Sequence, residues 1–119
     1  MRSYAVLSER EVSAKKTLDL TNAALTLRNS NQVVEQSDID VDGKHRGPGY
    51  GAPTSEMKTA VRIVARTEGI LLDPIYSGKA FGGMLFDART GSFNSGENIL
   101  FVMTGGMPGL FAYRSAFED

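Results

Sequence analysis

The stretch DPIYSGKAF, Asp73–Phe81, brings two hydroxyl side chains and a lysine close together. Tyr76 and Ser77 could transfer protons, since each hydroxyl can donate and accept a hydrogen bond. Lys79 follows a glycine, which suggests a phosphate site, but the P-loop pattern G-x-x-x-x-G-K-[ST] lacks its first glycine and its final hydroxyl here. A plainer interpretation makes Ser77 the N-cap of a helix and Tyr76 a loop anchor, while Lys79 lies on the helix surface or packs by its stem.

Two glycine-rich stretches could also present side chains to a ligand. Thr104 follows an apolar run in FVMTGG, and ligands of open α/β sheets bind beyond the carboxyl ends of the strands, where glycines allow close approach. Tyr50 lies within GPGYG, a rigid loop that displays one aromatic hydroxyl. Either stretch is equally well explained as a structural turn.

The remaining candidates for chemistry are weaker. His45 is the only histidine, so a Ser-His-Asp triad has no other choice, yet it lies in a polar stretch and we expect it to be solvated. Asp38, Asp40 and Asp42 alternate along the chain, which places all three on the outward face of a short strand. They are better explained as a solvated sheet edge than as a cation site.

Composition restricts the class of protein. The 119 residues suffice for one domain, 41% of them are apolar, and the net charge of -1 gives no basic footprint for nucleic acid. The absence of cysteine excludes a disulfide framework and a thiolate metal site. No run approaches about 18 apolar residues and the N-terminus lacks the apolar core of a signal peptide. We therefore expect a soluble, cytoplasmic protein with no membrane partner.

The hydrophobic pattern predicts two strands and a helix in the first half of the chain. The apolar residues 3–7 end a buried strand, and Ser8 with Glu11 matches the capping box that starts a helix. This helix runs to about Leu27 on an acceptable apolar stripe. Alternation then predicts a short, half-exposed strand at about residues 39–41.

The second half of the chain contains the clearest helical signal. After the loop 46–53, Thr54 is the N-cap of a helix that ends at Gly69. A further helix runs from about 78 to 87 and buries three side chains: Phe81, Met84 and Leu85. The run NILFVM, residues 98–103, predicts a central parallel strand, followed by a glycine turn into a final helix. The order β-α-β-loop-α-α-β-α predicts an α/β fold with a mostly parallel sheet.

Three segments, GPGYGAP, ARTEGILLDPIYSGKAFGGML and ILFVMTGGMPGLFAY, occur in this order along the chain. Together they resemble the C-terminal third of the D-cysteine desulfhydrase / 1-aminocyclopropane-1-carboxylate deaminase family, which consists of pyridoxal-phosphate (PLP) enzymes. The resemblance covers nearly all of the chain, most strongly residues 47–113. It implies PLP fold-type II, the tryptophan synthase β-like fold, which is a three-layer α/β sandwich with a mostly parallel sheet. Residues 1–119 would be a single domain, the C-terminal part of the cofactor-binding large domain.

The resemblance also assigns roles to the side chains singled out above. It makes Tyr76 the active-site tyrosine and a candidate acid/base, and it places Tyr50 near the substrate as a second catalytic candidate. It makes Thr104 the hydrogen-bond partner of the cofactor's pyridine nitrogen. Three further positions would be cofactor-binding: Ser77, Gly105 and Gly106. It implies no metal.

Ser77 and Thr104 match the two positions that separate the branches of this family. Deaminases resemble Tyr-Glu and Leu-Gly-Gly there, and desulfhydrases resemble Tyr-Ser and Thr-Gly-Gly, as in this chain. A hydroxyl leaves the pyridine ring largely neutral, and this weaker electron sink still suits β-elimination, in which a good leaving group carries the electrons away. The resemblance therefore implies elimination of cysteine to pyruvate, ammonia and sulfide. A cysteate sulfo-lyase and a 1-aminocyclopropane-1-carboxylate deaminase remain alternatives.

The chain departs from the family by lacking the Schiff-base lysine segment and the glycine-rich loop that grips the cofactor phosphate. None of its lysines lies in that motif: Lys15, Lys16, Lys44, Lys58 and Lys79. We therefore expect a fragment that neither binds PLP covalently nor catalyses alone. Its partner would be the missing N-terminal segment, acting in trans. Alternatively, the chain is a non-catalytic interaction module that covers its apolar faces by homo-oligomerisation.

Overall fold

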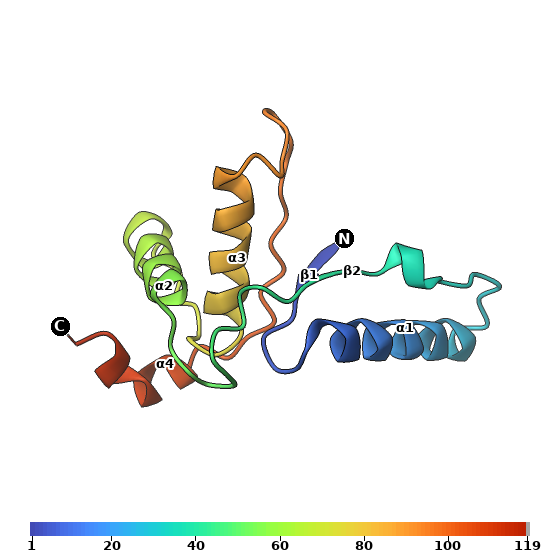
Figure 1. Cartoon of the computed structure of the whole chain (residues 1–119), viewed down its shortest axis with the longest axis horizontal. Coiled ribbons are helices and arrows are strands. Elements are labelled where there is room, and N and C mark those ends of the chain that lie inside the picture. The colour runs from blue at the N-terminus through green and yellow to red at the C-terminus, as the bar shows by residue number, and fades with distance from the viewer. Residues whose placement is uncertain (119) are drawn as a thin grey trace.

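The computed structural model describes residues 1–118 and is built mainly from helices (Figure 1). The elements are the strands β1 (Arg2–Tyr4) and β2 (Asp40–Asp42) and the helices α1 (Arg10–Leu27), α2 (Ser55–Glu68), α3 (Ser77–Arg89) and α4 (Gly109–Ala112). Short 3-10 turns precede β2 and follow α4: Gln36–Asp38 and Arg114–Ala116. In Figure 1, α1 extends to one side of the sheet, and α2 and α3 pack together on the other.

β1 and β2 form a two-stranded parallel sheet. Arg2 pairs with Asp40 and Tyr4 with Asp42, and α1 lies in the crossover between the two strands. A small apolar cluster joins the sheet to α1: Ala5, Ala14 and Val41. A parallel sheet with a helical crossover confirms the predicted α/β class.

α2 confirms the clearest prediction from the sequence. The Thr54 side chain accepts a hydrogen bond from the Met57 N–H at 3.2 Å, and the helix ends at Gly69, where φ is 67°. The apolar face of α2 supplies most of the main core: Met57, Val61, Val64 and, after the helix, Leu72. Leu110 and Phe117 pack on this cluster and tie the C-terminal segment to α2.

α3 approaches α2 through a glycine. A Cβ atom at Gly78 would lie 2.8 Å from the Val61 side chain, so only glycine permits this contact. Phe81, Met84 and Leu85, which the sequence predicts as buried, are only half-buried, and Phe81 packs on the main core cluster. Close packing of the helix backbones selects the glycine face instead.

α1 differs from its prediction at its start and along its apolar face. The helix begins at Arg10 without a side-chain cap, so the predicted capping box of Ser8 and Glu11 does not form. It ends at Leu27 as predicted. Leu20 and Leu27 are exposed, so the predicted apolar stripe of this helix is only partly covered.

The strand predicted at residues 98–103 is not formed. A strand needs a neighbour for its backbone groups, and the only sheet among residues 1–118 consists of β1 and β2. Leu100 and Val102 are exposed although their run is fully apolar. The three-layer sandwich is therefore not completed by the described residues, while its α/β class is present.

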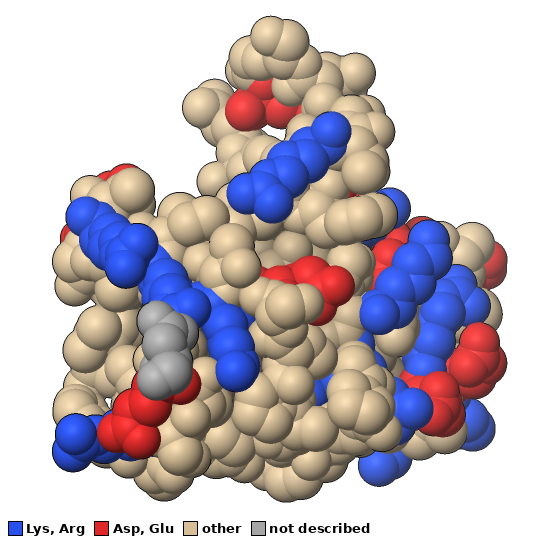
Figure 2. All heavy atoms as spheres, turned by 60° about the vertical axis from the view of Figure 1, so that its left-hand side comes forward, with Lys and Arg blue, Asp and Glu red and all other residues tan. Residues whose placement is uncertain are grey.

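No helix within the described part of the chain is long and apolar enough to cross a membrane. On the face shown in Figure 2, basic and acidic side chains are interspersed between wide uncharged areas.

Candidate functional site

Asp73 organises the start of α3, and it is only 2% exposed. Its carboxylate accepts hydrogen bonds from the N–H groups of Ile75 (2.8 Å), Tyr76 (2.7 Å) and Ser77 (2.8 Å), and from the Ser77 hydroxyl at 2.5 Å. Burial alone raises the pKa of Asp73, but these hydrogen bonds outweigh it and hold the pKa below its ordinary value. An ionised carboxylate from the chain itself therefore occupies the N-terminus of α3.

Ser77 is not the N-cap that the sequence predicts. It is the first residue of α3, and Asp73 makes the capping hydrogen bonds in its place. Ser77 Oγ donates to Asp73 Oδ2 and accepts from the Asp73 N–H at 2.9 Å. Sequence reasoning missed Asp73, although an aspartate directly before a proline at a helix start is a recognised turn signal.

Tyr50 and Tyr76 bring their hydroxyl groups together. Their Oη atoms lie 3.0 Å apart, although the two residues are 26 positions apart in the chain, and either can be the donor. Both rings are exposed and therefore open to a ligand. The hydrogen bond to Tyr50 raises the pKa of Tyr76. Tyr76 consequently stays protonated at neutral pH, and the pair can hold a proton or pass it on.

Lys79 holds the loop that carries Tyr50. Of the two placements expected for Lys79, the helix surface is ruled out, because the residue is only 1% exposed and its stem is buried. Its Nζ donates to Arg46 O at 2.6 Å and to Gly49 O at 3.0 Å, and these carbonyls replace the water around the ammonium. Burial, and then the charge of Arg46, lower the pKa of Lys79.

Glycines give this loop its shape. Gly47 and Gly51 have φ angles of 72° and 69°, which side chains rarely allow. A Cβ atom at Gly51 would also lie 2.7 Å from Tyr113 Oη. The C-terminal segment therefore packs directly on the loop.

Thr104, Gly105 and Gly106 form a turn that reaches Asp73. Gly105 and Gly106 have φ angles of 109° and 93°. A Cβ atom at Gly106 would lie 2.9 Å from Asp73 Cγ. Thr104 is exposed and lines a cavity together with Tyr76 and Ser77, which were also singled out from the sequence.

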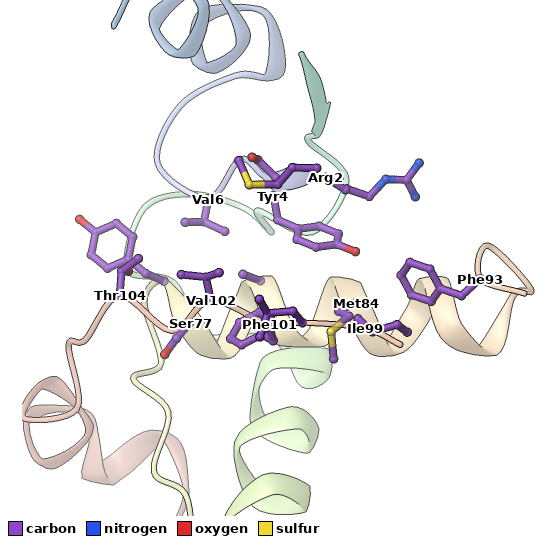
Figure 3. A pocket seen from close by; sticks show the side chains of 15 residues that line it. Arg2, Tyr4, Val6, Ser77, Met84, Phe93, Ile99, Phe101, Val102 and Thr104 are labelled. Atoms are coloured by element: carbon purple, nitrogen blue, oxygen red, sulfur yellow. The ribbon is translucent and has the colours of Figure 1, made fainter. Parts of the chain in front are cut away.

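This cavity has a volume of about 550 Å³ and lies between β1, α3 and the segment 98–104 (Figure 3). Figure 3 shows Ser77 and Thr104 at one end and Phe93 at the other. Its lining is mainly apolar: Val6, Met84, Phe93, Ile99, Phe101 and Val102. Among residues 1–118, no lysine lines it.

His45 is packed between aromatic rings, so the prediction of a solvated side chain is wrong. Its ring centroid lies 6.0 Å from that of Tyr4 and 5.2 Å from that of Phe86, and its Nε2 is buried without a partner among the described residues. Nearby, Asp87 accepts hydrogen bonds from Tyr4 Oη at 2.7 Å and from Arg2 Nη1 at 2.9 Å. These contacts join β1 to α3, which explains why His45 is not at the surface.

No family model matches the sequence, but individual relatives do. The chain is 35% identical over 116 residues to the 1-aminocyclopropane-1-carboxylate deaminase of Burkholderia ambifaria (strain MC40-6), a match covering 91% of this chain and 34% of the relative. It is 41% identical over 87 residues to the protein of the same name from Burkholderia cenocepacia (strain HI2424), covering 73% and 25%. A crystal structure of an ACC deaminase homologue matches with a TM-score of 0.83 and 35% identity, over 98% of this chain and 34% of that one.

The chain belongs to the 1-aminocyclopropane-1-carboxylate deaminase family. It corresponds to the C-terminal part of the family's members and spans about a third or less of the length of the curated relatives it matches. The deaminase family is PLP-dependent.

The described residues fit one side of a PLP site. Tyr76 and the Thr104 hydroxyl line the apolar cavity, whereas Ser77 already donates its hydroxyl proton to Asp73. Lys79 points its ammonium at loop carbonyls, so within residues 1–118 the side chains of the cavity lining offer hydroxyl groups and no lysine amine. The contacts of Thr104, Ser77, Gly105 and Gly106 with a cofactor stay predictions.

Proposed function

We propose that this chain supplies the substrate-facing part of a PLP-dependent lyase site that carries out β-elimination on D-cysteine. The observation that carries the proposal is the meeting of Tyr50 Oη and Tyr76 Oη at 3.0 Å, beside a cavity that Tyr76 shares with Thr104. These groups are neutral hydroxyls and none is a carboxylate. Such a site suits a substrate whose leaving group departs with its own electron pair.

Tyr76 Oη acts as the proton donor in this proposal. A base that this chain does not supply takes the Cα proton, the electron pair left at Cα forms the Cα=Cβ bond, and the Cβ–S electron pair leaves with sulfur, which Tyr76 protonates. Tyr50 returns a proton to Tyr76 along their hydrogen bond. PLP, when bound, supplies the electron sink for the loss of the Cα proton. Cysteine and one water yield pyruvate, ammonia and hydrogen sulfide.

The packing of Ser77 supports elimination over deamination of 1-aminocyclopropane-1-carboxylate. Ser77 Oγ lies 2.5 Å from Asp73 Oδ2 inside the protein. A glutamate at this position, which the resemblance assigns to deaminases, would bring two carboxylates together in a buried place. The relatives are named deaminases, however, so ring-opening deamination is the second candidate function.

A chimera tests the proposal, with this chain replacing the matched region of the Burkholderia cenocepacia relative. The matched control is the same chimera carrying Ser77→Glu and Thr104→Leu. We expect the unsubstituted chimera to release sulfide from D-cysteine, and only the control to release ammonia from 1-aminocyclopropane-1-carboxylate. Tyr76→Phe should abolish sulfide release while the absorbance of bound PLP stays unchanged. Ammonia release from the cyclopropane by the unsubstituted chimera, without sulfide release from D-cysteine, contradicts the proposal.

A further inference from the structure

Asp73 lies between the two segments that carry the candidate site, and it is not among the residues that line the cavity. On one side, its carboxylate accepts hydrogen bonds from the N–H groups of Tyr76 and Ser77 at 2.7 and 2.8 Å. On the other side, it lies against the glycine turn after Thr104, because a Cβ atom at Gly106 would stand 3.0 Å from Asp73 Oδ2 and 3.2 Å from Asp73 Cβ. One buried side chain therefore contacts both segments, and Figure 3 shows Ser77 and Thr104 at the same end of the cavity.

The carboxylate of Asp73 has no acceptor capacity left for a ligand. Oδ1 accepts hydrogen bonds from the N–H groups of Ile75 (2.8 Å) and Tyr76 (2.7 Å). Oδ2 accepts from the Ser77 N–H at 2.8 Å and from the Ser77 hydroxyl at 2.5 Å. A carboxylate offers about four lone-pair positions, and all of them are used inside the protein. Any effect of Asp73 on the reaction therefore passes through the groups that it holds.

Asp73 fixes the backbone of Tyr76. Tyr76 directly precedes the first residue of α3, and its carbonyl accepts a hydrogen bond from the Ala80 N–H at 2.9 Å. Together with the bond from its own N–H to Asp73 Oδ1, this holds the Tyr76 backbone on both sides. Packing restrains the side chain less, since Tyr76 is 41% exposed and its ring centroid lies 5.9 Å from that of Tyr50. The two backbone bonds therefore set the direction in which the Tyr76 side chain leaves the start of the helix.

The glycine turn meets Asp73 at Gly106. The surrounding residues 102–108 are exposed, and a Cβ atom at Gly105 would meet nothing within 4 Å. Of the two glycines, Gly106 is therefore the one that makes the close approach. Its carbonyl accepts a hydrogen bond from the Gly109 N–H at 2.9 Å, which ties the turn to α4. The position of Thr104, two residues before Gly106, consequently depends on the contact between Gly106 and Asp73.

We propose that Asp73 is a positioning residue that keeps the Tyr76 hydroxyl and the Thr104 turn in a fixed relation to each other. The inference rests on the proposed function for the roles of Tyr76 and Thr104 in the reaction. Groups that act on one substrate must keep their productive geometry to within about 0.5 Å, which requires packed and hydrogen-bonded neighbours. A single carboxylate in contact with both segments meets this requirement. A disturbance of either segment is consequently transmitted to the other.

Asp73→Asn tests the proposal in the chain alone. The amide nitrogen that replaces one oxygen cannot accept a hydrogen bond, so part of the set of four is lost. We expect the backbone NMR order parameter of Gly106 to fall from about 0.85 to below about 0.6. A general loss of stability would not produce this fall, because the order parameter is measured on the folded molecules. Asp19→Asn is the matched control, since Asp19 is exposed on α1, and it should leave the order parameter of Gly106 unchanged.

Two glycine variants test transmission in the opposite direction, and both keep the Asp73 charge. Gly105 and Gly106 have positive φ angles, so alanine strains the backbone at either position. Only at Gly106 would the new Cβ atom meet Asp73, at 2.9 Å from Cγ. We expect Gly106→Ala to speed hydrogen exchange of the Tyr76 N–H at least about tenfold. The pKa of Tyr76, which its hydrogen bond to Tyr50 raises, should fall towards its ordinary value in an NMR titration of labelled tyrosine. Gly105→Ala is the matched control and should change neither quantity.

Either of two results would overturn the proposal. The first is an unchanged order parameter of Gly106 in folded Asp73→Asn protein. The second is the same exchange rate and the same pKa of Tyr76 in Gly106→Ala and Gly105→Ala. The glycine variants alter an exposed turn, so they decide the question even where Asp73→Asn prevents folding. No catalysis is measured, so failure of the chimera to release sulfide leaves this inference standing, and its own failure leaves the proposed elimination untouched.

Discussion

Replacing Lys79 with methionine removes the ammonium that holds the Tyr50 loop and keeps most of the apolar stem. Lys79 Nζ donates to Arg46 O at 2.6 Å and to Gly49 O at 3.0 Å. Hydrogen bonds to a charged group contribute about 1.5–3 kcal/mol each, so two of them contribute about 3–6 kcal/mol. Burial of the ammonium offsets part of this gain, and the same burial lowers the pKa of Lys79. We expect Lys79→Met to lower the free energy of unfolding by about 2–4 kcal/mol.

Urea unfolding followed by far-UV circular dichroism measures this loss. Lys16→Met is the matched control, because Lys16 is exposed on α1 and its substitution should change the free energy of unfolding by no more than about 0.5 kcal/mol. The site gives a second readout. If the loop is released, Tyr50 no longer bonds Tyr76, and the pKa of Tyr76 falls towards its ordinary value in an absorbance titration. A loss below about 1 kcal/mol together with an unchanged Tyr76 pKa would refute the idea that Lys79 holds the loop.

Three further substitutions or treatments probe the same region. The pKa of Asp73 is lowered in the folded protein, so its contribution is present above the unfolded pKa and is lost as the pH falls through the folded one. Asp73→Asn should therefore destabilise the chain strongly at neutral pH. The difference in urea midpoint between this variant and the unsubstituted chain should become smaller as the pH is lowered. Gly78→Ala should cost about 1–3 kcal/mol, because the new Cβ would lie 2.6 Å from the Asp73 carbonyl oxygen. Gly109→Ala is the control for Gly78→Ala, because a Cβ atom at Gly109 would meet no other atom within 4 Å. It should not reduce the melting temperature. Incubation of the chain alone with PLP and borohydride should leave no adduct on a specific lysine by mass spectrometry; such an adduct would show that an amine is available after all.

Local signals in the sequence were sufficient for α2 and insufficient for α3. Thr54 and Gly69 are caps whose action depends on their own helix, and the spacing of apolar residues between them identifies the buried face. In α3 the same periodicity identifies the larger side chains and does not identify Gly78, where α3 contacts α2. The close approach of two helices depends on the shape of both surfaces, and the sequence of one helix gives no information on the surface of the other.

The residue types at the site could be predicted from the sequence, whereas most of their contacts could not. Tyr50, Tyr76 and Thr104 stand out as hydroxyl groups on glycine-rich or helix-start segments. The burial of Lys79 depends on loop carbonyls 33 and 30 residues away, and that of His45 on Tyr4 in β1. A polar side chain is buried where the fold supplies partners, so composition of the surrounding stretch misleads for both residues.

Residues 98–104 concern both the sheet and the site, because they form the predicted strand that is absent from the sheet and they line the cavity. The apolar run predicts a buried strand, but burial of a strand depends on neighbours that need not lie in the same part of the chain. Thr104, at the end of this segment, lines the cavity together with Tyr76 and Val102. In the chimera, Val102→Pro should therefore weaken PLP affinity, measured by cofactor absorbance. Tyr76→Phe should leave the cofactor absorbance unchanged and abolish only the chemistry, because the Tyr76 hydroxyl bonds to Tyr50.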